Sequence, residues 1–456
     1  MSSSVKTPPQ LPACTHTPRP YTGPPRAEVL DMRREFLAPA LLTYYRDPVL
    51  IVEGHMQYLF DETGKRYLDG FAGIVTVSVG HCHPKVLDAV REQNERLQHT
   101  TTIYLHNNIA QFAKLLASTF PEDSGLGVTY FVNAGSEAND LAIMMARMHT
   151  NNYDVIALRN AYHGTSPSAV GLTALNTWKY PMPQGFGVHH ARMPDLLRGP
   201  WKHGDPNAAA NYADDVRDLI QHATSGNLAA FIAEPIQGVG GTIELPPGYL
   251  ARVYDHVRAA GGLCISDEVQ TGFGRTGTKF WGFENHAVTP DIVTMAKGIG
   301  NGAPLAAVTT RADIAQTLKQ RLHFNTYGGN PVSCAQGLAT LSVILDDNIQ
   351  QRAHDVGGYL KSGLESLMAD HPSIAEVRGQ GLMLGVDIVE DRTTLAPSPA
   401  RCAAVHERSK DLGLLIGKGG LHGNVLRIKP PMCMTREDAD FMVRVLDIAF
   451  TDAERA

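Results

Sequence analysis

Short apolar runs alternate with helical patterns through the middle third of the chain. Apolar runs at 128–132, 155–158, 229–233, 263–265 and 292–295 predict strands, and apolar positions at helical spacing predict helices at 136–149, 216–223 and 249–260. Strands that alternate with helices in this way form a mostly parallel sheet covered on both faces. The pattern therefore predicts an α/β domain, whose ligands collect at the carboxyl ends of the strands.

The pattern changes at both ends of the chain. Residues 57–69 predict a β-hairpin around a Glu-Thr-Gly turn, and Pro84 begins an amphipathic helix. After a helix at 335–345, strands at 382–388 and 425–428 and a helix at 438–450 predict a smaller α+β unit, which the hairpin joins. We expect an N-terminal arm (1–34), the first part of a small domain (35–85), a large domain (86–345) and a C-terminal small domain (346–456).

Composition narrows the class of protein. The 456 residues exceed one ordinary domain, and 43% apolar with 19% charged residues is typical of a soluble globular protein. A net charge of −6 without a basic stripe argues against nucleic acid or an anionic membrane as the partner. Six scattered cysteines predict free thiols in a reducing compartment, and no apolar run is long enough to span a membrane. We therefore expect a cytoplasmic protein.

The first thirty residues are rich in proline, serine and threonine and have no acidic residue before Glu28. An organelle transit segment is also poor in acids, but it forms an amphipathic helix, which the prolines between residues 8 and 25 disfavour. The segment is predicted to be a flexible arm, with mitochondrial targeting as the alternative.

Two predicted strands end in side chains that one cofactor could use together, a carboxylate and an amine. Asp267 and Glu268 follow the strand at 263–265, and Lys297 follows the strand at 292–295. Alone, a lysine or an Asp-Glu pair after a strand is most often a solvated surface group. Together, an amine and a carboxylate are what pyridoxal 5′-phosphate (PLP) requires, because it needs a lysine for its Schiff base and an anion beside its pyridine nitrogen. The pair predicts a PLP site.

Other motifs resemble sites for a phosphate, a metal ion or a dinucleotide. The segment Asn-Ala-Gly-Ser-Glu-Ala-Asn (133–139) lies between a strand and a helix, where free backbone N–H groups and the helix dipole favour a phosphate. Simple capping of the helix by Ser136 is the alternative. His81, Cys82 and His83 are adjacent and point to alternate faces, so no metal site is predicted. The glycine runs at 238–241 and 298–302 lack the dinucleotide spacing.

Six motifs occur in one order: the segment at 133–139, Ala-Tyr-His-Gly (161–164), Glu-Pro-Ile-Gln-Gly (234–238), Asp-Glu-Val-Gln-Thr-Gly-Phe-Gly-Arg (267–275), Ala-Lys-Gly (296–298) and Phe-Asn-Thr-Tyr-Gly-Gly-Asn (324–330). From about residue 35 the chain resembles the class III PLP aminotransferases of the ornithine and 4-aminobutyrate type. Residues 73–84 and 295–302 are most similar to the alanine–glyoxylate aminotransferase 2 branch. The resemblance implies PLP fold type I, with a mostly parallel seven-stranded sheet in the large domain and a smaller α+β domain. It also implies a homodimer that shares its active sites, with a tetramer as the alternative.

The resemblance also implies roles for residues around the PLP ring. Lys297 would be the Schiff-base lysine and the acid/base that moves the proton. Asp267 would pair with the pyridinium nitrogen, and Val269 and Tyr162 would lie against the two faces of the ring. Gln270 would lie near the ring hydroxyl.

A second set of implied roles concerns the phosphate and the substrate. Gly135 and Ser136 would hold the phosphate, which Thr326 of the partner subunit would complete. Arg427 would grip the substrate α-carboxylate with its planar fork. Glu234 would pair with Arg427 when the substrate is an ω-amine without an α-carboxylate.

One departure from the family pattern bears on substrate choice. Members specialised for ornithine or 4-aminobutyrate carry an arginine just after the aromatic–X–Gly segment, where this chain has Thr165. The absence of this arginine favours alanine, β-alanine or a related amino acid as the amino donor and pyruvate or glyoxylate as the acceptor. The exception is a site in which Arg275 or an arginine of the partner subunit binds the second carboxylate. The alternatives are a 4-aminobutyrate/ornithine-type transaminase using 2-oxoglutarate, a PLP decarboxylase or aminomutase, and a non-enzymatic relative. The intact Lys297 and Asp267 argue against the last.

Overall fold

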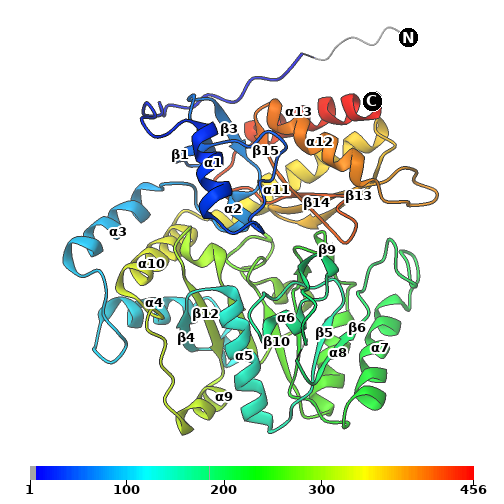
Figure 1. The fold of residues 1–456 in the computed structure, drawn as a ribbon. Coiled ribbons are helices and arrows are strands. Elements are labelled where there is room, and N and C mark those ends of the chain that lie inside the picture. Colours follow the sequence, from blue (N-terminus) through cyan, green and yellow to red (C-terminus); the bar gives the residue numbers. More distant parts are fainter. Residues whose placement is uncertain (1–6, 184, 456) are drawn as a thin grey trace.

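The computed structural model describes residues 7–183 and 185–455. Its centre is a seven-stranded sheet in the order β4-β12-β11-β10-β7-β5-β6 (Figure 1). The strands are β4 (Val128–Val132), β5 (Val155–Leu158), β6 (Val188–Ala191), β7 (Ala230–Ala233), β10 (Leu263–Asp267), β11 (Ile292–Met295) and β12 (Ala306–Thr310). Only β12 runs antiparallel to its neighbours β11 and β4. The predicted mostly parallel sheet is confirmed.

Helices cover both faces of this sheet because its strands are apolar on both sides. Phe231 and Cys264 pack toward the helices on one face, α7 (Ala208–Ala223) and α8 (Tyr249–Ala259). Ile232 and Ile265 are the next residues along the same strands and pack toward α5 (Gly135–Thr150) on the other face. The helices α3 (Pro84–Arg96), α4 (Asn107–Ala117) and α10 (Pro331–Asp346) pack together beside β4.

Two smaller sheets lie above the large one in Figure 1. An antiparallel sheet has the order β13-β14-β17-β16, and its strands are β13 (Ile374–Gln380), β14 (Met383–Ile388), β16 (Gly417–Gly419) and β17 (Val425–Ile428). It packs with α11 (Ile349–Ser366), α12 (Pro399–Asp411) and α13 (Arg436–Arg455). The second sheet joins β1 (Ile51–His55), β2 (Tyr58–Asp61) and β3 (Arg66–Asp69) to β15 (Leu414–Leu415). The N-terminal hairpin thus pairs directly with the C-terminal part of the chain.

Short elements complete the chain. They are α2 (Ala72–Val75), α6 (Ala169–Leu172), α9 (Ala312–Gln316), β8 (Ile236–Gln237), β9 (Ile243–Glu244) and the 3-10 helices η1 (Glu122–Ser124), η2 (Asn176–Trp178), η3 (Gly282–His286), η4 (Lys297–Gly300), η5 (Thr317–Gln320) and η6 (Leu367–Ala369). Within the described residues, no helix combines the length and the apolar character that crossing a bilayer requires.

The N-terminal segment differs from the expected flexible arm. Helix α1 (Arg26–Phe36) begins directly after Pro25, because the prolines disfavour helix only as far as that residue. Ahead of it, Leu11 and Cys14 pack against the core of the small sheets. Arg66 donates to the Pro12 carbonyl at 2.7 Å, and His16 Nε2 lies 2.6 Å from Glu53 Oε1. These contacts anchor residues 11–16 to the body of the protein.

Helix α2 is a single left-handed turn. Ala72, Gly73, Ile74 and Val75 all have positive φ angles between 52° and 66°. This conformation costs about 1–2 kcal/mol for each residue with a Cβ. The Asp69 carboxylate holds the start of the turn, because its Oδ1 accepts from the backbone N–H groups of Phe71 and Ala72 at 2.9 and 2.7 Å. The turn packs against η4.

Candidate active site

A cavity of about 140 Å³ lies at the carboxyl ends of β10 and β11, and its lining contains most of the residues that the sequence predicts for a PLP site. The predicted residues in its wall are Gly135, Ser136, Tyr162, Glu234, Asp267, Val269, Gln270 and Lys297. Asn139, His163 and Gly164 complete the lining. The fold therefore brings together segments that are far apart in the sequence.

Asp267 is the last residue of β10, and its carboxylate is almost fully buried. Its Oδ2 lies 2.7 Å from His163 Nδ1 and accepts from Asn139 Nδ2 at 2.9 Å, and its Oδ1 accepts from the Val269 N–H at 3.1 Å. These contacts fix the orientation of the carboxylate. Sequence reasoning missed His163 and Asn139, although both lie within motifs that had been recognised.

Lys297 follows β11 as the first residue of η4, with a left-handed φ of 49°. Burial lowers the pKa of its amine, and the nearby Arg427 lowers it further, while Asp267 and Glu234 act in the opposite direction. The lowered pKa makes the free amine available for nucleophilic and acid/base chemistry. The unusual backbone angle stores about 1–3 kcal/mol of strain at this position.

The N-terminus of α5 is open toward the cavity. Its N-cap residue, Ala134, has no side chain that could satisfy the first backbone N–H groups, and Gly135 and Ser136 form the first turn. The alternative in which Ser136 caps the helix is therefore wrong, because Ser136 lies inside the helix. Free N–H groups and the positive end of the dipole suit a phosphate.

Gly164 closes the wall opposite this helix end. Its φ is +122°, and a Cβ at this position would lie 2.3 Å from Ser136 Oγ. Only glycine fits here, so the chain after Tyr162 approaches Ser136 closely. Tyr162 itself lines the cavity and packs edge-on against Trp178, with ring centroids 5.1 Å apart.

Glu234 and Gln270 form another part of the wall. Glu234 follows β7, and its carboxylate accepts from the N–H groups of Tyr162 at 3.1 Å and Gly238 at 2.8 Å. Burial raises the pKa of Glu234, and Asp267 adds to this, while His163 and the two N–H groups lower it. The Gln270 side chain is almost fully buried beside Gly238.

Arg427 lies on β17 with a side chain that is 5% exposed. Its guanidinium packs against the Phe71 ring, 5.3 Å from the centroid, and its Nε and Nη2 have no hydrogen-bond partner among the described residues. It does not line the small cavity itself. Two buried N–H donors without partners fit a carboxylate, whose two oxygens accept such a pair.

Three other positions bear on the predictions. Thr326 is exposed in the chain before α10 and is not in the cavity wall. Thr165 is exposed next to the cavity, and its N–H donates to Ser136 Oγ at 3.4 Å. Arg275 is buried and does not line the cavity. Its Nη1 donates to the carbonyls of Leu382 and Pro430, while its Nη2 has no hydrogen-bond partner among the described residues.

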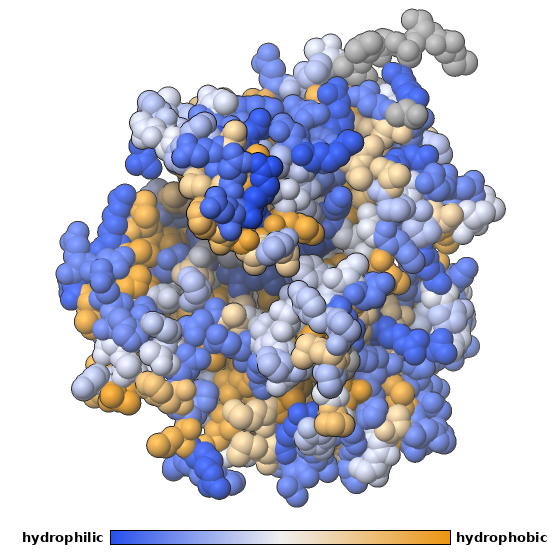
Figure 2. Space-filling model, viewed as in Figure 1, coloured by the Kyte–Doolittle hydropathy of each residue, from blue (hydrophilic) through white to orange (hydrophobic). Residues whose placement is uncertain are grey.

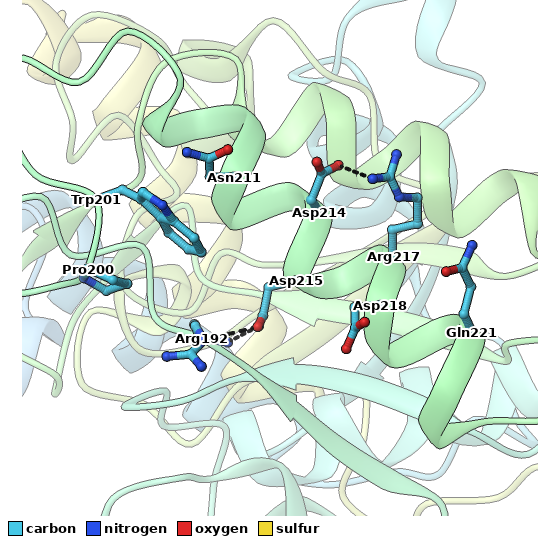
Figure 3. A pocket seen from close by; sticks show the side chains of 9 residues that line it. All are labelled: Arg192, Pro200, Trp201, Asn211, Asp214, Asp215, Arg217, Asp218 and Gln221. Atoms are coloured by element: carbon cyan, nitrogen blue, oxygen red, sulfur yellow. Dashed lines mark hydrogen bonds and ion pairs between the residues drawn. The ribbon is translucent and has the colours of Figure 1, made fainter.

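A larger cavity of about 530 Å³ lies elsewhere, between α7 and the chain after β6 (Figure 3). Four of its five charged side chains pair with one another: Arg192 Nε lies 3.1 Å from Asp215, and Arg217 lies 3.1 Å from Asp214. None of the predicted site residues lines it. The smaller cavity is therefore the candidate active site.

The residues present fit PLP. A fixed carboxylate, an amine with a lowered pKa and an uncapped helix N-terminus supply the three groups that its pyridine nitrogen, aldehyde and phosphate require. The unpartnered buried atoms His163 Nε2 and Asn139 Oδ1 belong to the side chains that hold Asp267.

Comparisons with known proteins identify the family of this chain. The family model "Aminotransferase class-III" matches residues 43–450. Alanine–glyoxylate aminotransferase 2 homolog 2 of Arabidopsis thaliana, named as mitochondrial, is 52% identical over 97% of this chain and 91% of its own length. The human alanine–glyoxylate aminotransferase 2, also named as mitochondrial, is 44% identical over 98% of this chain and 91% of its own length. A phospholyase from Arthrobacter, solved in complex with phosphoethanolamine, has a TM-score of 0.87 and 36% identity over 93% of this chain and 99% of its own.

Proposed function

Because this chain belongs to the class III aminotransferases, which are PLP enzymes of fold type I, we propose that it moves an amino group between a small amino acid and pyruvate or glyoxylate. The donor would be alanine, β-alanine or a related β- or ω-amino acid. The observation that carries the proposal is the pair of unpartnered, buried N–H donors on Arg427 near a cavity that contains Asp267 and Lys297.

PLP, when bound, withdraws electrons from the substrate Cα. Gly135 and Ser136 would hold its phosphate with the N–H groups at the start of α5, and Asp267 would face its pyridine nitrogen. Tyr162 and Val269 would flank its ring, with Gln270 near the ring hydroxyl. These positions follow from the family motifs, and their common cavity supports them.

Lys297 would hold the cofactor covalently through Nζ and, once the substrate amine replaces it, take the proton from the substrate Cα. The lowered pKa of this amine supports the role, because a general base must be unprotonated before it accepts a proton. Asp267, held by His163 and Asn139, would keep its charge aimed at the ring throughout.

Arg427 would grip the carboxylate of the amino acid and of the oxo acid. For an ω-amine without an α-carboxylate, Glu234 would turn to pair with this guanidinium. In the structure the two side chains form no ion pair, and Glu234 instead accepts two backbone N–H groups. This arrangement leaves Arg427 ready for a carboxylate.

The choice of a monocarboxylate acceptor rests on what surrounds the cavity. Thr165 stands where related enzymes carry an arginine, and Arg275, whose Nη1 donates to two backbone carbonyls, does not line the cavity. The second charge of 2-oxoglutarate would therefore be buried without a partner, at a penalty of about 1–3 kcal/mol.

The test compares kcat/KM for pyruvate, glyoxylate and 2-oxoglutarate, with L-alanine or β-alanine as donor and with glutamate as donor when pyruvate is the acceptor. We expect the two monocarboxylates to exceed 2-oxoglutarate by about ten- to hundredfold. A preference for 2-oxoglutarate would return the enzyme to the ornithine/4-aminobutyrate type. Phosphate release from phosphoethanolamine, measured in parallel, would instead place it with the phospholyase.

We also propose a homodimer in which Thr326 of the partner subunit completes the phosphate site. Exposed apolar side chains near Thr326 and in the chain before α4 support this proposal: Ile103, Tyr104, Leu105, Leu322, Phe324 and Tyr327. Figure 2 shows apolar patches among the polar residues of the surface that it draws, and exposed apolar patches commonly mark subunit contacts. Sedimentation analysis at micromolar concentration should give twice the monomer mass, and a monomer with full activity would contradict the shared site.

We also propose a cellular location and domain limits, both on the basis of the sequence. The cytoplasmic assignment rests on the scattered cysteines and on the prolines that disfavour a transit helix, and the mitochondrial names of two relatives weigh against it. Fractionation of cells that express the full chain with a C-terminal tag decides between the two compartments. The proposed small domain, 35–85 with 346–456, is consistent with the pairing of β3 with β15.

A further inference from the structure

Lys429 is a fully buried lysine to which none of the proposed steps assigns a task. It directly follows β17, two residues after Arg427, and its side chain has no exposed surface. Its Nζ donates to Gln270 Oε1 at 3.0 Å and to the Gly238 carbonyl at 3.3 Å. Lysine is almost never fully buried unless it is paired, and here both acceptors are neutral.

The charges around Lys429 do not explain its burial. Three cationic side chains, Arg427, Lys297 and Arg275, act on it unfavourably, and only Glu234 acts favourably. Burial first, and then Arg427, therefore hold the pKa of this amine well below its ordinary range. Burying an amine among other cationic side chains destabilises the fold. Stability therefore does not explain why Lys429 is placed against Gln270.

The contact fixes the orientation of the Gln270 amide. Gly238 lies directly beside this amide, and a Cβ there would approach its Cδ, Nε2 and Oε1 to 2.3–2.4 Å, so the side chain rests against bare backbone. Lys429 Nζ donates to the Gln270 oxygen, so the amide turns its oxygen toward Nζ and its NH₂ group away. No hydrogen bond from that NH₂ group to a described residue is found, and Gln270 lines the cavity with Lys297 and Asp267.

We propose that Lys429 is a positioning residue that holds the Gln270 amide so that its N–H points at the ring oxygen of PLP. The inference rests on the proposed function, because it takes the cavity as the PLP site. A donor at that oxygen stabilises its anionic form. Lys429 thereby links the strand that carries the substrate-binding Arg427 to the residue that faces the cofactor ring.

The test uses the holoenzyme and two readouts besides turnover: the dissociation constant of PLP and the apparent pKa of the visible absorbance change. Lys429→Met replaces the amine with an apolar side chain of similar length, and Lys429→Leu is a second replacement, so the result does not depend on the folding of one variant. Lys410→Met is the matched control, because Lys410 is a buried lysine on α12 that contacts Glu407 and the Asp47 carbonyl rather than the cavity.

We expect Lys429→Met to weaken PLP binding by about three- to tenfold and to raise the apparent pKa of the absorbance change by about half a unit to one unit, the size of one lost hydrogen bond. Lys410→Met should leave both quantities unchanged. Because Lys429 acts through Gln270, the double variant Gln270→Ala/Lys429→Met should match Gln270→Ala alone in both readouts.

A Lys429→Met enzyme that unfolds at a different temperature but keeps the wild-type absorbance pKa and PLP affinity would overturn the inference, because the lysine would then be structural. Additive shifts in the double variant would overturn it as well. These outcomes differ from failure of the proposed function, in which the wild-type protein itself would show no visible PLP band and no amino transfer.

Discussion

His163 Nδ1 lies 2.7 Å from Oδ2 of Asp267, and both side chains are buried at the base of the cavity. His163 belongs to the chain after β5, whereas Asp267 ends β10, so the contact joins two segments of the large sheet at the same edge. Since Asn139 donates to the same oxygen, the carboxylate cannot rotate without breaking two contacts. The orientation of Asp267 is therefore set before any cofactor enters.

Asp267→Asn should leave PLP bound but poorly reactive, because a neutral amide cannot hold the proton on the pyridine nitrogen. We expect kcat to fall by about a hundred- to thousandfold, as when one preorganised electrostatic group is removed elsewhere. Single-turnover kinetics with L-alanine measure this step. A variant within tenfold of the wild-type kcat would remove Asp267 from the role.

Lys297→Ala should abolish amino transfer and covalent attachment of the cofactor, while the protein still folds and binds PLP weakly. The substitution removes both the attachment point and the proton acceptor. Borohydride reduction followed by mass spectrometry of the denatured protein should find PLP on the wild-type chain only. Near wild-type turnover by the variant would show that another group supplies the base.

Thr165→Arg should supply the partner that a second carboxylate lacks. Thr165 is exposed beside the cavity, next to Gly164 and Ser136, so a longer side chain has room there. We expect kcat/KM for 2-oxoglutarate to rise about tenfold relative to pyruvate. Thr165→Lys is a charge-matched comparison without the planar fork, and it should gain less. An unchanged ratio in both variants would mean that the second carboxylate lies elsewhere.

Gly164→Ala should weaken PLP binding by at least about tenfold, because the new Cβ would meet Ser136 Oγ at the proposed phosphate site and the φ of +122° is strained for alanine. Gly358→Ala is the control: Gly358 lies in α11 with no atom within 4 Å of the added methyl group. This control should be more stable by about 0.5–1 kcal/mol and bind PLP normally. Equilibrium dialysis and thermal unfolding give the two quantities.

Glu268→Gln tests a buried carboxyl group behind the active site. Burial raises the pKa of Glu268 to about 7, against four donors that lower it: Ser266, Thr271, Gly282 and Phe283. Between pH 4.5 and 7 the folded protein then holds a proton that the unfolded chain has released, so the free energy of unfolding falls as the pH rises, by about 3 kcal/mol. Urea unfolding of the cofactor-free protein should show this slope for the wild type and a much smaller one for the variant. Equal slopes would mean that Glu268 is charged throughout.

The strands that were predicted with correct limits share one property. β4, β5, β11 and β17 are short, mostly apolar runs of four or five residues, which is the length and composition expected of a buried strand. β12 was missed because Ala-Ala-Val-Thr-Thr has little apolar character, although all five residues are buried between β11 and β4. Its neighbours in the sheet, and not its own sequence, make it a strand.

The site residues were found from motifs, whereas their supporting contacts were not. Asn139 and His163 reach Asp267 across more than a hundred residues of sequence, and Lys429 reaches Gln270 across a longer span still. Nothing in a local pattern indicates such pairs. Helix α7 begins at Ala208, earlier than the predicted start at residue 216. The left-handed turn at Ala72–Val75 had no sequence signal beyond its single glycine.

The pairing of β3 with β15 has a consequence for synthesis of the chain. Leu68 and Leu414 are partners in one sheet, so the first strands to leave the ribosome lack their neighbour until about 350 more residues have been made. During that interval β3 presents an open edge, which can recruit strands from other nascent chains. Contacts of such high sequence separation also slow folding. The sheet of the N-terminal hairpin therefore cannot be completed until residues near 414 have been made.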